Sequence, residues 1–296
     1  MRVERLIGPN TSPERAKQLR DYASWLLSVG DGTIPTIHKN IIEVPSQMVC
    51  KDPIDLRDKV YNDFYQNDHY KDPAYLRQRA ILCTRNDTTQ QANFDMVQNR
   101  LEGDLTVSIS VDECIDDNDK QKYDTNFLHK IEAPGLPAHR LALKKNACVI
   151  LIRNLNVKRR QCNGTRCIIT DVKPHVLRAT LLDGGDHSEI FIPKIPIICE
   201  NTEFPANFTR TQFPILGAYY LTFNRAQGQS LDRVGMLLPH SVFAHGQIYT
   251  GCSRSGDPDH TFIWADQSEF EPWIEDGTLD KNKTYTRNII YPEVLS

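Results

Sequence analysis

The sequence predicts an α/β fold in which a parallel sheet is interrupted by a small antiparallel β domain. The first observation is the stretch Tyr219–Arg254 with the residues just before it. Its apolar run 215–223, expected to form one buried strand, leads into the polar loop 224–229, a second apolar run and a helix-compatible segment. The second is a buried-strand pattern at Ala80–Thr84 that leads into a helix pattern at Thr88–Arg100, which is the repeating unit of parallel sheets. The third is the region from about 123 to 205, where prolines exclude long helices and short β runs alternate with turns.

The composition excludes a membrane-spanning protein and a disulfide-stabilised secreted domain. The chain has 296 residues, of which 40% are hydrophobic and 25% charged, and no apolar run approaches the ~20 residues that a spanning helix needs. The eight cysteines form no C-x-x-C pair, and the N-terminus carries no leader pattern, so we expect reduced thiols in an intracellular protein. The spacing of Cys162, Cys167 and His175 fits no standard zinc site, and we predict no metal there.

The N-terminal part alternates helices with short strands. Residues 12–29 predict an amphipathic helix that begins at the N-cap Ser12, with Pro13 in its first turn, and ends at Gly30-Asp31-Gly32. A turn and a short strand follow at 36–48, and a second helix at 54–64. We therefore expect a helical layer ahead of the first buried strand of the sheet.

The helix at 88–100 predicts an inner stripe of Ala92, Phe94, Val97 and Leu101. Another strand is expected at 105–111. The acidic residues 112–124 read as a loop whose carboxylates have no partner suited to acid–base catalysis.

Short β runs dominate the middle of the chain and predict a small β-barrel inserted into the α/β part. They are expected at 148–152, 165–172, 176–182 and 189–192, with hairpin-type turns at Asn163-Gly164 and at 183–186. Phe208–Phe213 is expected to return the chain to the α/β part. Thr261–Ala265 predicts a last strand, and the acidic, aromatic tail after it is expected to be irregular.

A basic block lies inside an acidic protein. Between His139 and Arg178 there are ten lysines and arginines but one acidic residue, so this block has a net charge of +9. Because the whole chain has a net charge of −3, the other residues together carry −12. A block of this size indicates a polyanionic partner such as nucleic acid. The block contains no Phe, Tyr or Trp, which favours contacts to a phosphate backbone over base stacking.

Several segments resemble the Pif-type helicases, superfamily-one 5′-to-3′ DNA helicases that include the helicase end of Helitron transposons. Gly135-Leu136-Pro137, Leu151–Leu155 and Cys162–Arg166 match the inserted domain of that family. Thr222–Leu231 (TFNRAQGQSL) and Pro239–Arg254, with its His245-Gly246-Gln247 core, match the family's last motifs. The resemblance covers nearly all of the chain up to about Ala265.

The resemblance implies that this chain is the second of two RecA-like domains, with an inserted SH3-like β-barrel. The expected parts are residues 1–122 and 207–265 for the RecA-like domain, 123–206 for the barrel, and 266–296 for an irregular tail. The implied partners are single-stranded or forked DNA and an N-terminal helicase half, with no membrane. The family is compatible with nucleus or mitochondrion, and we expect the nucleus.

The resemblance also implies roles for individual residues. Arg254 matches the arginine finger that reaches the γ-phosphate of ATP, and Arg2 matches an arginine that contacts a nucleotide phosphate. Gln227 and Gly228 match a loop that couples nucleotide to DNA. The expected contacts to nucleic acid are Asn224, Arg225, Gln227, Arg153, Asn163 and Arg166. From the residues alone, Arg254 reads instead as a solvated arginine at a helix end, where the helix dipole stabilises it.

The sequence departs from the family at the coupling loop and ahead of the finger. Arg225 stands where lysine is usual and Ala226 where serine is usual, so the charge is kept and one hydroxyl is lost. Gly251-Cys252 replaces a more apolar pair, and a glycine is expected to loosen that helix turn.

No G-x-x-x-x-G-K-[ST] loop occurs in the sequence, so ATP and Mg²⁺ are expected only together with a missing first motor domain. Because Met1-Arg2 falls inside a family motif, we expect a truncated gene model, a decayed transposon copy or half of a split protein. Three functions stay open: the C-terminal motor half of an ATP-dependent helicase that is inactive alone, a non-catalytic binding module for single-stranded nucleic acid, or an inert relic.

Overall fold

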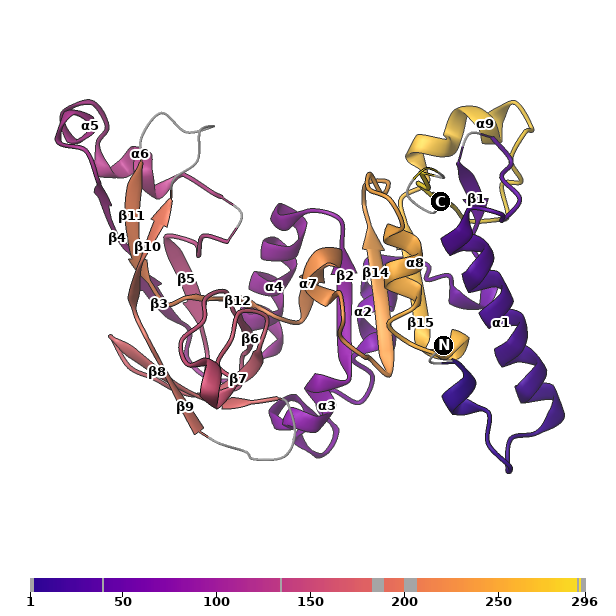
Figure 1. Ribbon diagram of the computed structural model, residues 1–296, viewed down its shortest axis with the longest axis horizontal. Coiled ribbons are helices and arrows are strands. Elements are labelled where there is room, and N and C mark those ends of the chain that lie inside the picture. Colours follow the sequence, from indigo (N-terminus) through magenta and orange to yellow (C-terminus); the bar gives the residue numbers. More distant parts are fainter. Residues whose placement is uncertain are drawn as a thin grey trace. The chain divides into compact units, whose positions relative to one another are not determined.

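The computed structural model describes residues 3–38, 40–133, 135–182, 189–199, 207–291 and 293 (Figure 1). The chain divides into two compact units. The first consists of residues 1–66, 78–89 and 220–296, and the second of residues 67–77 and 90–219. The second unit therefore takes in more of the chain than residues 123–206, and the four-part division expected above stays a prediction.

The first unit is built on a four-stranded parallel sheet with the order β13–β2–β14–β15. These strands are β13 (Tyr220–Thr222), β2 (Arg79–Cys83), β14 (Arg233–Leu238) and β15 (Thr261–Ala265). β14 is central and pairs with both β2 and β15 in parallel register. The predicted α/β class with a parallel sheet is confirmed.

Helices cover both faces of this sheet. α2 (Pro53–Val60) lies on the face of Gly235, where an added Cβ would come within 2.8 Å of Val60 and 3.0 Å of Leu56. α8 (Gln247–Cys252) lies on the opposite face, because its Gly251 approaches Met236, the next residue of β14. Successive residues of a strand point to opposite faces, so the two glycines allow a close approach on each side.

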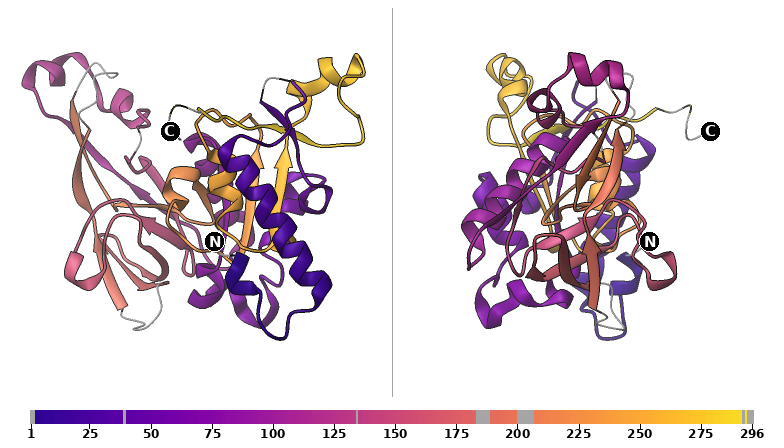
Figure 2. Two further views of the ribbon diagram at one scale, coloured as in Figure 1. Left: turned by 45° about the vertical axis from the view of Figure 1, so that its right-hand side comes forward. Right: turned by 90° about the vertical axis from the view of Figure 1, so that its left-hand side faces the viewer.

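Helix α1 (Pro13–Asp31) forms the outer layer of the first unit and packs against α8 (Figure 2). Its N-cap is the predicted one, because the Ser12 hydroxyl accepts from the Arg15 amide at 3.2 Å. It ends at Gly32, whose φ of 72° is the left-handed conformation that glycine adopts without strain. The hydroxyl of Tyr22 donates to the Cys252 carbonyl at 2.9 Å and so ties α1 to the end of α8.

The C-terminal tail, expected to be irregular, holds short regular elements within residues 266–291. It contains α9 (Glu271–Glu275) and β16 (Tyr285–Arg287), which pairs antiparallel with β1 (Ile41–Glu43). Ile41, Phe270, Leu279 and Tyr285 form a small separate core there. The partner strand lies more than 240 residues earlier in the chain, so the local sequence of the tail could not indicate the pairing.

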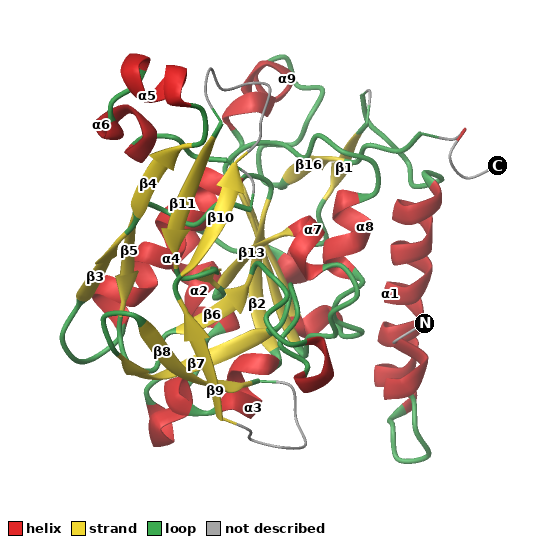
Figure 3. Cartoon of the chain, turned by 60° about the vertical axis from the view of Figure 1, so that its left-hand side comes forward, coloured by secondary structure: helices red, strands yellow, loops and turns green. Residues whose placement is uncertain are grey.

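The second unit contains a five-stranded antiparallel sheet with the order β12–β6–β7–β8–β9 (Figure 3). The strands are β12 (Ile215–Gly217), β6 (Cys148–Leu151), β7 (Arg166–Val172), β8 (Val176–Leu181) and β9 (Glu189–Pro193). Four of them are the short strands predicted from the sequence, and the antiparallel insertion is confirmed. The predicted turn at 183–186 lies outside the described residues.

Two predictions about the return of the chain were wrong. Phe208–Phe213 does not rejoin the parallel sheet, because β11 (Phe208–Gln212) pairs antiparallel with β10 (Ile195–Cys199) and β4 (Val111–Cys114). The apolar run from 215 to 223 is also not one strand. Its first part is β12 in the second unit, and its second part is β13 in the first unit.

The acidic segment after residue 111 is not a loop, in contrast to the prediction. It holds β4 and α5 (Asp117–Lys122), followed by α6 (Thr125–His129). Asp112 on β4 has a partner after all, because the buried Arg210 binds its carboxylate at 2.7 Å. The preceding β3 (Thr106–Ile109) pairs antiparallel with β5 (Arg140–Leu143).

Helix α4 (Asn86–Arg100) begins in the first unit and continues in the second. Phe94, expected in its inner stripe, is 43% exposed, and Asn93 is buried instead. The Asn93 carboxamide oxygen accepts from the Tyr219 amide at 3.0 Å, so a short polar side chain satisfies a buried backbone donor there.

The remaining short elements are α3 (Pro73–Arg77) and the 3₁₀ turns η1 (Val3–Leu6), η2 (Ser46–Met48), η3 (Gln66–Lys71), η4 (Val157–Arg159), η5 (Pro258–His260) and η6 (Ser268–Phe270). None of the eight cysteines forms a disulfide. No helix in the described part of the chain is both long and apolar enough to cross a membrane.

Candidate nucleotide and nucleic-acid site

The loops that follow the parallel strands meet at one edge of the first unit. Because all four strands run in the same direction, their carboxyl ends lie together, and this edge is where open α/β sheets bind ligands. β13 leads into the short helix α7 (Phe223–Ala226), and β2 leads through Thr84 and Arg85 into α4. The predicted loop Asn224–Gln229 therefore lies at the edge expected of a ligand site.

The loop Asn224–Gln229 exposes the groups that a phosphate or a base can reach. Asn224, Gln227 and Gly228 are exposed, whereas Arg225 is half-buried. Burial lowers the pKa of Arg225 from its ordinary value, although an arginine stays charged at neutral pH. Gly228 has a φ of 83° and open space around it, so it is required for its backbone conformation and leaves the loop backbone accessible.

Arg254 follows α8 and turns back onto this loop. Its Nη1 donates to the carbonyls of Ala226 at 3.5 Å and Gln229 at 3.3 Å. Its Nε donates to the Thr250 carbonyl at 2.8 Å, and its Nη2 to the Ser253 hydroxyl at 2.8 Å. The structure thus brings the predicted finger and the predicted coupling loop into direct contact.

The backbone around Arg254 reinforces this contact. The Leu231 amide donates to the Arg254 carbonyl at 3.1 Å, so the chain is held to the loop by main chain as well as side chain. Arg254 itself is half-buried. A guanidinium in this position is close enough to the surface to contact a phosphate.

Residues at the end of β2 were missed by the sequence reasoning. Arg85 and Asn86 are exposed at the N-terminus of α4, where backbone amides and the helix dipole favour an anion. The buried Thr84 hydroxyl has no hydrogen-bond partner among the described residues. The signal was available, because Arg85-Asn86 directly follows the predicted buried strand Ala80–Thr84.

The predicted residues of the second unit divide into surface and interior. Asn163 is exposed in the turn before β7, where its amide donates to the Asn154 side chain at 2.8 Å. Arg153 is half-buried, and its Nη1 donates to the Ile152 carbonyl at 3.0 Å. Arg166 is only 7% exposed, and its Nη2 donates to the Ala218 carbonyl at 2.8 Å. Arg166 therefore supports the sheet from inside, and we leave it out of the proposed nucleic-acid surface.

The basic block is also less uniform than its sequence indicates. Lys144 is buried and donates to the carbonyls of Gln98 and Leu101. Lys173 and Arg178 form ion pairs with Asp171 and Glu189. Exposed cations are concentrated in the turn around η4, which contains Lys158, Arg159 and Arg160.

The turn around η4 is held in shape by its own side chains. The Asn156 side chain accepts from the Arg159 amide at 3.2 Å, and the Thr165 hydroxyl donates to the Arg160 carbonyl at 2.9 Å. Preorganised cations on a turn are suited to phosphate contacts, because little side-chain and backbone freedom is lost on binding.

The expected cofactor fits these residues only in part. A guanidinium and exposed backbone groups can bind phosphate oxygens of ATP. None of Arg254, Gln227 and Gly228 carries a carboxylate, so we assign Mg²⁺ to no residue of this site. Arg2, the other predicted nucleotide contact, lies outside the described residues.

One group of possible metal ligands occurs in the described residues, and its environment does not favour an ion. It consists of Asp112, His129 and His139. Both oxygens of Asp112 already accept from Arg210, and the Ser110 hydroxyl donates to one of them at 2.6 Å. The two imidazoles stack with centroids 3.6 Å apart, and the Nδ1 of His139 is 2.8 Å from the Ser110 hydroxyl.

The fold and this edge site define an α/β domain in which an arginine and a polar loop lie together at the carboxyl edge of a parallel sheet. Residues 126–172 match the family model for the 2B domain of the DNA helicase Pif1. The chain is 27% identical over 218 residues to the ATP-dependent DNA helicase PIF1 of Danio rerio, covering 70% of this chain and 30% of that protein. The corresponding human protein is 26% identical over 186 residues, covering 59% and 25%.

Solved structures of Pif1 helicases from other organisms are also similar. The Candida albicans Pif1 helicase has a TM-score of 0.48 and 21% identity, covering 75% of this chain and 57% of that one. Unliganded Pif1 from Bacteroides sp has a TM-score of 0.45 and 15% identity, covering 92% and 57%. The chain is thus similar to the Pif1 helicases and spans less than a third of the length of those two curated relatives. The Helitron part of the resemblance stays a prediction.

Proposed function

We propose that this chain is the C-terminal motor half of an ATP-dependent 5′-to-3′ DNA helicase, in which Arg254 acts as an arginine finger. The observation that carries the proposal is the contact between the Arg254 guanidinium and the carbonyls of the loop Asn224–Gln229. In a motor protein the residue that contacts the nucleotide must be coupled to the loop that contacts DNA, because ATP hydrolysis has to change the affinity for the strand.

The geometry supports a simple exchange at Arg254. Its hydrogen bonds to Ala226 and Gln229 are long, at 3.5 and 3.3 Å, whereas its bond to Thr250 is 2.8 Å. Long bonds of this kind are weak, and a charge-assisted bond to a phosphate oxygen is stronger. We infer that Nη1 leaves the loop when a γ-phosphate is present, while Nε stays on Thr250 and keeps the side chain oriented.

DNA contacts are assigned to groups at the same edge and to the turn around η4. At the edge these are Asn224, Gln227 and the backbone at Gly228, together with Arg85 and Asn86. In the second unit they are Lys158, Arg159 and Arg160, with Arg153 and Asn163 beside them in sequence. Neutral side chains and amides position a phosphate backbone, and the cations supply most of the affinity. Arg225 contributes charge near the edge.

The 296 residues contain no phosphate-binding Walker loop, so ATP hydrolysis would require residues supplied from outside this sequence. The proposed partners are a first motor domain, which would hold ATP and Mg²⁺, and single-stranded or forked DNA. Solved structures of Pif1 helicases include one with single-stranded DNA and one with ADP-AlF4. A nuclear location of this chain stays a prediction.

The test is ATP hydrolysis by this chain alone and by the chain joined to the first motor domain of a Pif1 helicase. We expect no hydrolysis by the chain alone, with or without an oligo-dT strand. We expect DNA-stimulated hydrolysis by the joined protein. Stimulated hydrolysis by the isolated chain would contradict the proposal, and so would a folded joined protein that binds oligo-dT but does not hydrolyse ATP.

A further inference from the structure

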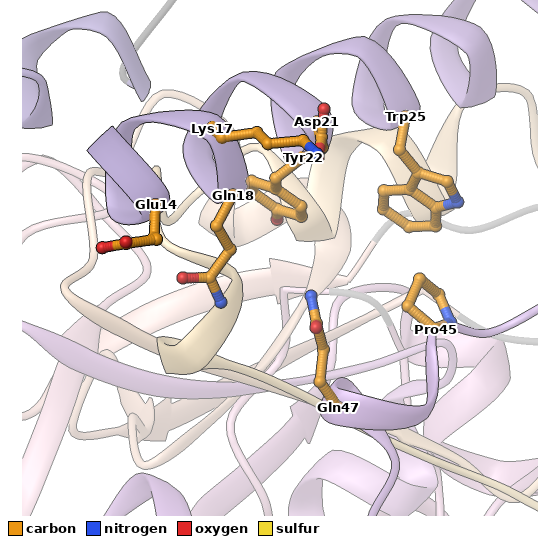
Figure 4. Close-up of a pocket in the computed structure, with 8 residues that line it drawn as sticks. All are labelled: Glu14, Lys17, Gln18, Asp21, Tyr22, Trp25, Pro45 and Gln47. Carbon is orange, nitrogen blue, oxygen red and sulfur yellow. The ribbon is translucent and has the colours of Figure 1, made fainter. Parts of the chain in front are cut away.

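A groove on the first unit lies along one face of helix α1 and takes no part in the site described above. Its α1 wall consists of residues at helical spacing, namely Glu14, Lys17, Gln18, Asp21, Tyr22 and Trp25, and its other wall consists of Pro45 and Gln47 (Figure 4). The cavity measures about 460 Å³. This volume lies within the range of pockets that bind a small ligand or a short peptide.

One end of the groove is aromatic. Trp25 is half-buried and stacks on Tyr22, with ring centroids 5.9 Å apart and an angle of 17° between the planes. The Pro45 ring lies across the groove from the Trp25 indole (Figure 4). Flat, rigid rings of this kind line the grooves that bind polyproline II segments. Such a segment is already extended and stiff, so its proline rings stack on a flat surface with little loss of conformational entropy.

The other end is acidic. This end carries the exposed Glu14, whereas the exposed Asp21 lies beside Tyr22, and Lys17 reaches along α1 toward Asp21 (Figure 4). Behind this wall Arg15 is paired with Asp257 at 2.5 Å and with Asp259 at 2.6 Å. Among the residues that line the groove itself, two carboxylates, Glu14 and Asp21, face one cation, Lys17. This balance attracts a cationic group and repels phosphates.

The length of the groove sets the spacing of its ligand. From Glu14 to Trp25 an α-helix rises about 16 Å, at 1.5 Å per residue. A polyproline II segment covers that distance in about five residues, at 3.1 Å each. Between the two ends, the exposed Gln47 points its carboxamide into the groove (Figure 4), where it can bond the unpaired carbonyls of such a segment.

We propose that this groove binds an extended, proline-containing peptide segment of a partner protein. A proline of the segment packs between Trp25 and Pro45, and an arginine or lysine about five residues away pairs with Glu14. Gln18 does not contribute to the ligand, because its carboxamide is already bonded to Arg15 and Asp259. The proposal does not depend on the helicase function, since none of these residues belongs to the edge site.

Single-stranded nucleic acid is the competing ligand, because a base could also stack on Trp25. Its phosphates would lie along the carboxylates of the same wall. Competition between a peptide and an oligonucleotide therefore separates the two ligands directly.

The test measures fluorescence anisotropy of the full chain with a labelled peptide, Pro-Pro-Ala-Pro-Ala-Ala-Arg. Two matched peptides serve as comparisons, one with Glu in place of Arg and one with Ala in place of every Pro. We expect the first peptide to bind at least about tenfold more tightly than either comparison. Unlabelled oligo-dT is expected not to displace it.

Variants of both walls identify the site. Trp25→Ala is expected to weaken binding at least about tenfold, as for a buried aromatic anchor. Gln47→Ala, on the exposed opposite wall, is expected to weaken it about threefold without affecting the fold. Glu14→Gln is expected to remove the preference for Arg over Glu. Arg20→Gln is the matched control, because Arg20 is an exposed residue of α1 that does not line the groove.

Three results would overturn the proposal. The first is equal binding of all three peptides, or no binding of any of them at millimolar concentration. The second is displacement of the peptide by oligo-dT. The third is an affinity for the peptide that is unchanged in both Gln47→Ala and a folded Trp25→Ala variant. Circular dichroism of each variant shows whether it is folded. None of these results bears on ATP hydrolysis, so failure here is distinguishable from failure of the proposed helicase function.

Discussion

Arg210 and Arg254 both donate hydrogen bonds to three backbone carbonyls, yet their surroundings give them different roles. Arg210 is 1% exposed and binds the carboxylate of Asp112 as well as the carbonyls of Leu128, Ile131 and Pro137. Its charge is neutralised inside the unit, so it fixes the segment from α6 to Pro137. Arg254 is half-buried at the carboxyl edge of the parallel sheet, and it donates to the carbonyls of Ala226, Gln229 and Thr250 and to the Ser253 hydroxyl.

Removal of Asp112 tests the structural role of Arg210. Asp112→Ala leaves a buried guanidinium without its counter-charge, and we expect the free energy of unfolding to fall by about 3–5 kcal/mol. Urea unfolding followed by circular dichroism measures it. Lys173→Ala, which breaks an exposed ion pair, is the control and should leave the free energy of unfolding nearly unchanged. A loss below about 1 kcal/mol in Asp112→Ala would show that Arg210 does not hold this segment.

The stacked histidines predict a pH dependence of stability. Burial and the neighbouring His129 lower the pKa of His139 below its ordinary value of about 6.5. The Asp112 carboxylate raises this pKa, and Arg210 and Arg140 lower it, each by a smaller amount. The unfolded chain therefore binds this proton more readily. Stability contributed by neutral His139 is present above about pH 6.5 and is lost as the pH falls toward the lowered value.

His129→Phe keeps a stacked ring and removes the neighbouring charge. We expect the variant to lose less unfolding free energy than wild type between pH 7.5 and 5.5, as measured by urea unfolding at each pH. His175→Gln, at an exposed position, is the control. An equal loss in wild type and His129→Phe would argue against coupling between the two rings.

At the scale of elements, local patterns predicted where strands and helices lie better than which sheet they join. The four short strands of the five-stranded sheet follow from alternating apolar residues and turns. The apolar run from 215 to 223 looks like one strand, because nothing in its composition marks the change of sheet at Ala218–Tyr219. Only the pairing of Leu216 with Ile150 and of Leu221 with Leu82 separates the two parts.

Gly251 illustrates the same limit. From the sequence a glycine loosens the helix turn ahead of Arg254, but the structure gives it a packing role. A Cβ there would lie 2.4 Å from the Met236 sulfur and 2.8 Å from the Phe223 ring. The glycine lets α8 approach β14 and α7, and this approach places Arg254 against the loop Asn224–Gln229.

Gly251→Ala is therefore expected to destabilise the chain, although alanine favours helices. Overpacking of this kind costs about 1–3 kcal/mol, more than the gain in helix propensity of about 1 kcal/mol. Thermal unfolding by circular dichroism checks the direction. Thr250→Ala, one residue earlier in the same helix, is the matched control. A higher melting temperature for Gly251→Ala would contradict the packing role.

At the scale of the whole molecule, the net charge of a segment predicted a basic surface but not its extent. Of the ten cations between His139 and Arg178, Lys144 and Arg166 turned out to be buried and bonded to carbonyls, and Lys173 and Arg178 to be paired with acids. Burial and pairing depend on tertiary contacts that a count of charges cannot contain. The edge site was predictable because its two parts lie in one stretch of sequence.

The remaining cations predict the salt dependence of DNA binding. Neutralising Lys158, Arg159 and Arg160 together by substitution with Gln removes up to three phosphate contacts. At about 0.7 per contact for single strands, the slope of log K against log salt should become shallower by about two. Anisotropy of labelled oligo-dT over a salt series measures it, with Lys173→Gln and Arg178→Gln as the control. An unchanged slope would place the DNA elsewhere.

The most direct test of the central claim is the turnover number for ATP hydrolysis by the joined protein with Arg254→Ala. An arginine finger contributes about 10³–10⁵ in rate, so we predict a loss in that range with nucleotide affinity changed less than about tenfold. Arg57→Ala, at a partly exposed arginine paired with Asp58, is the control and should keep the wild-type rate. A turnover number within about threefold of wild type in Arg254→Ala would contradict the account.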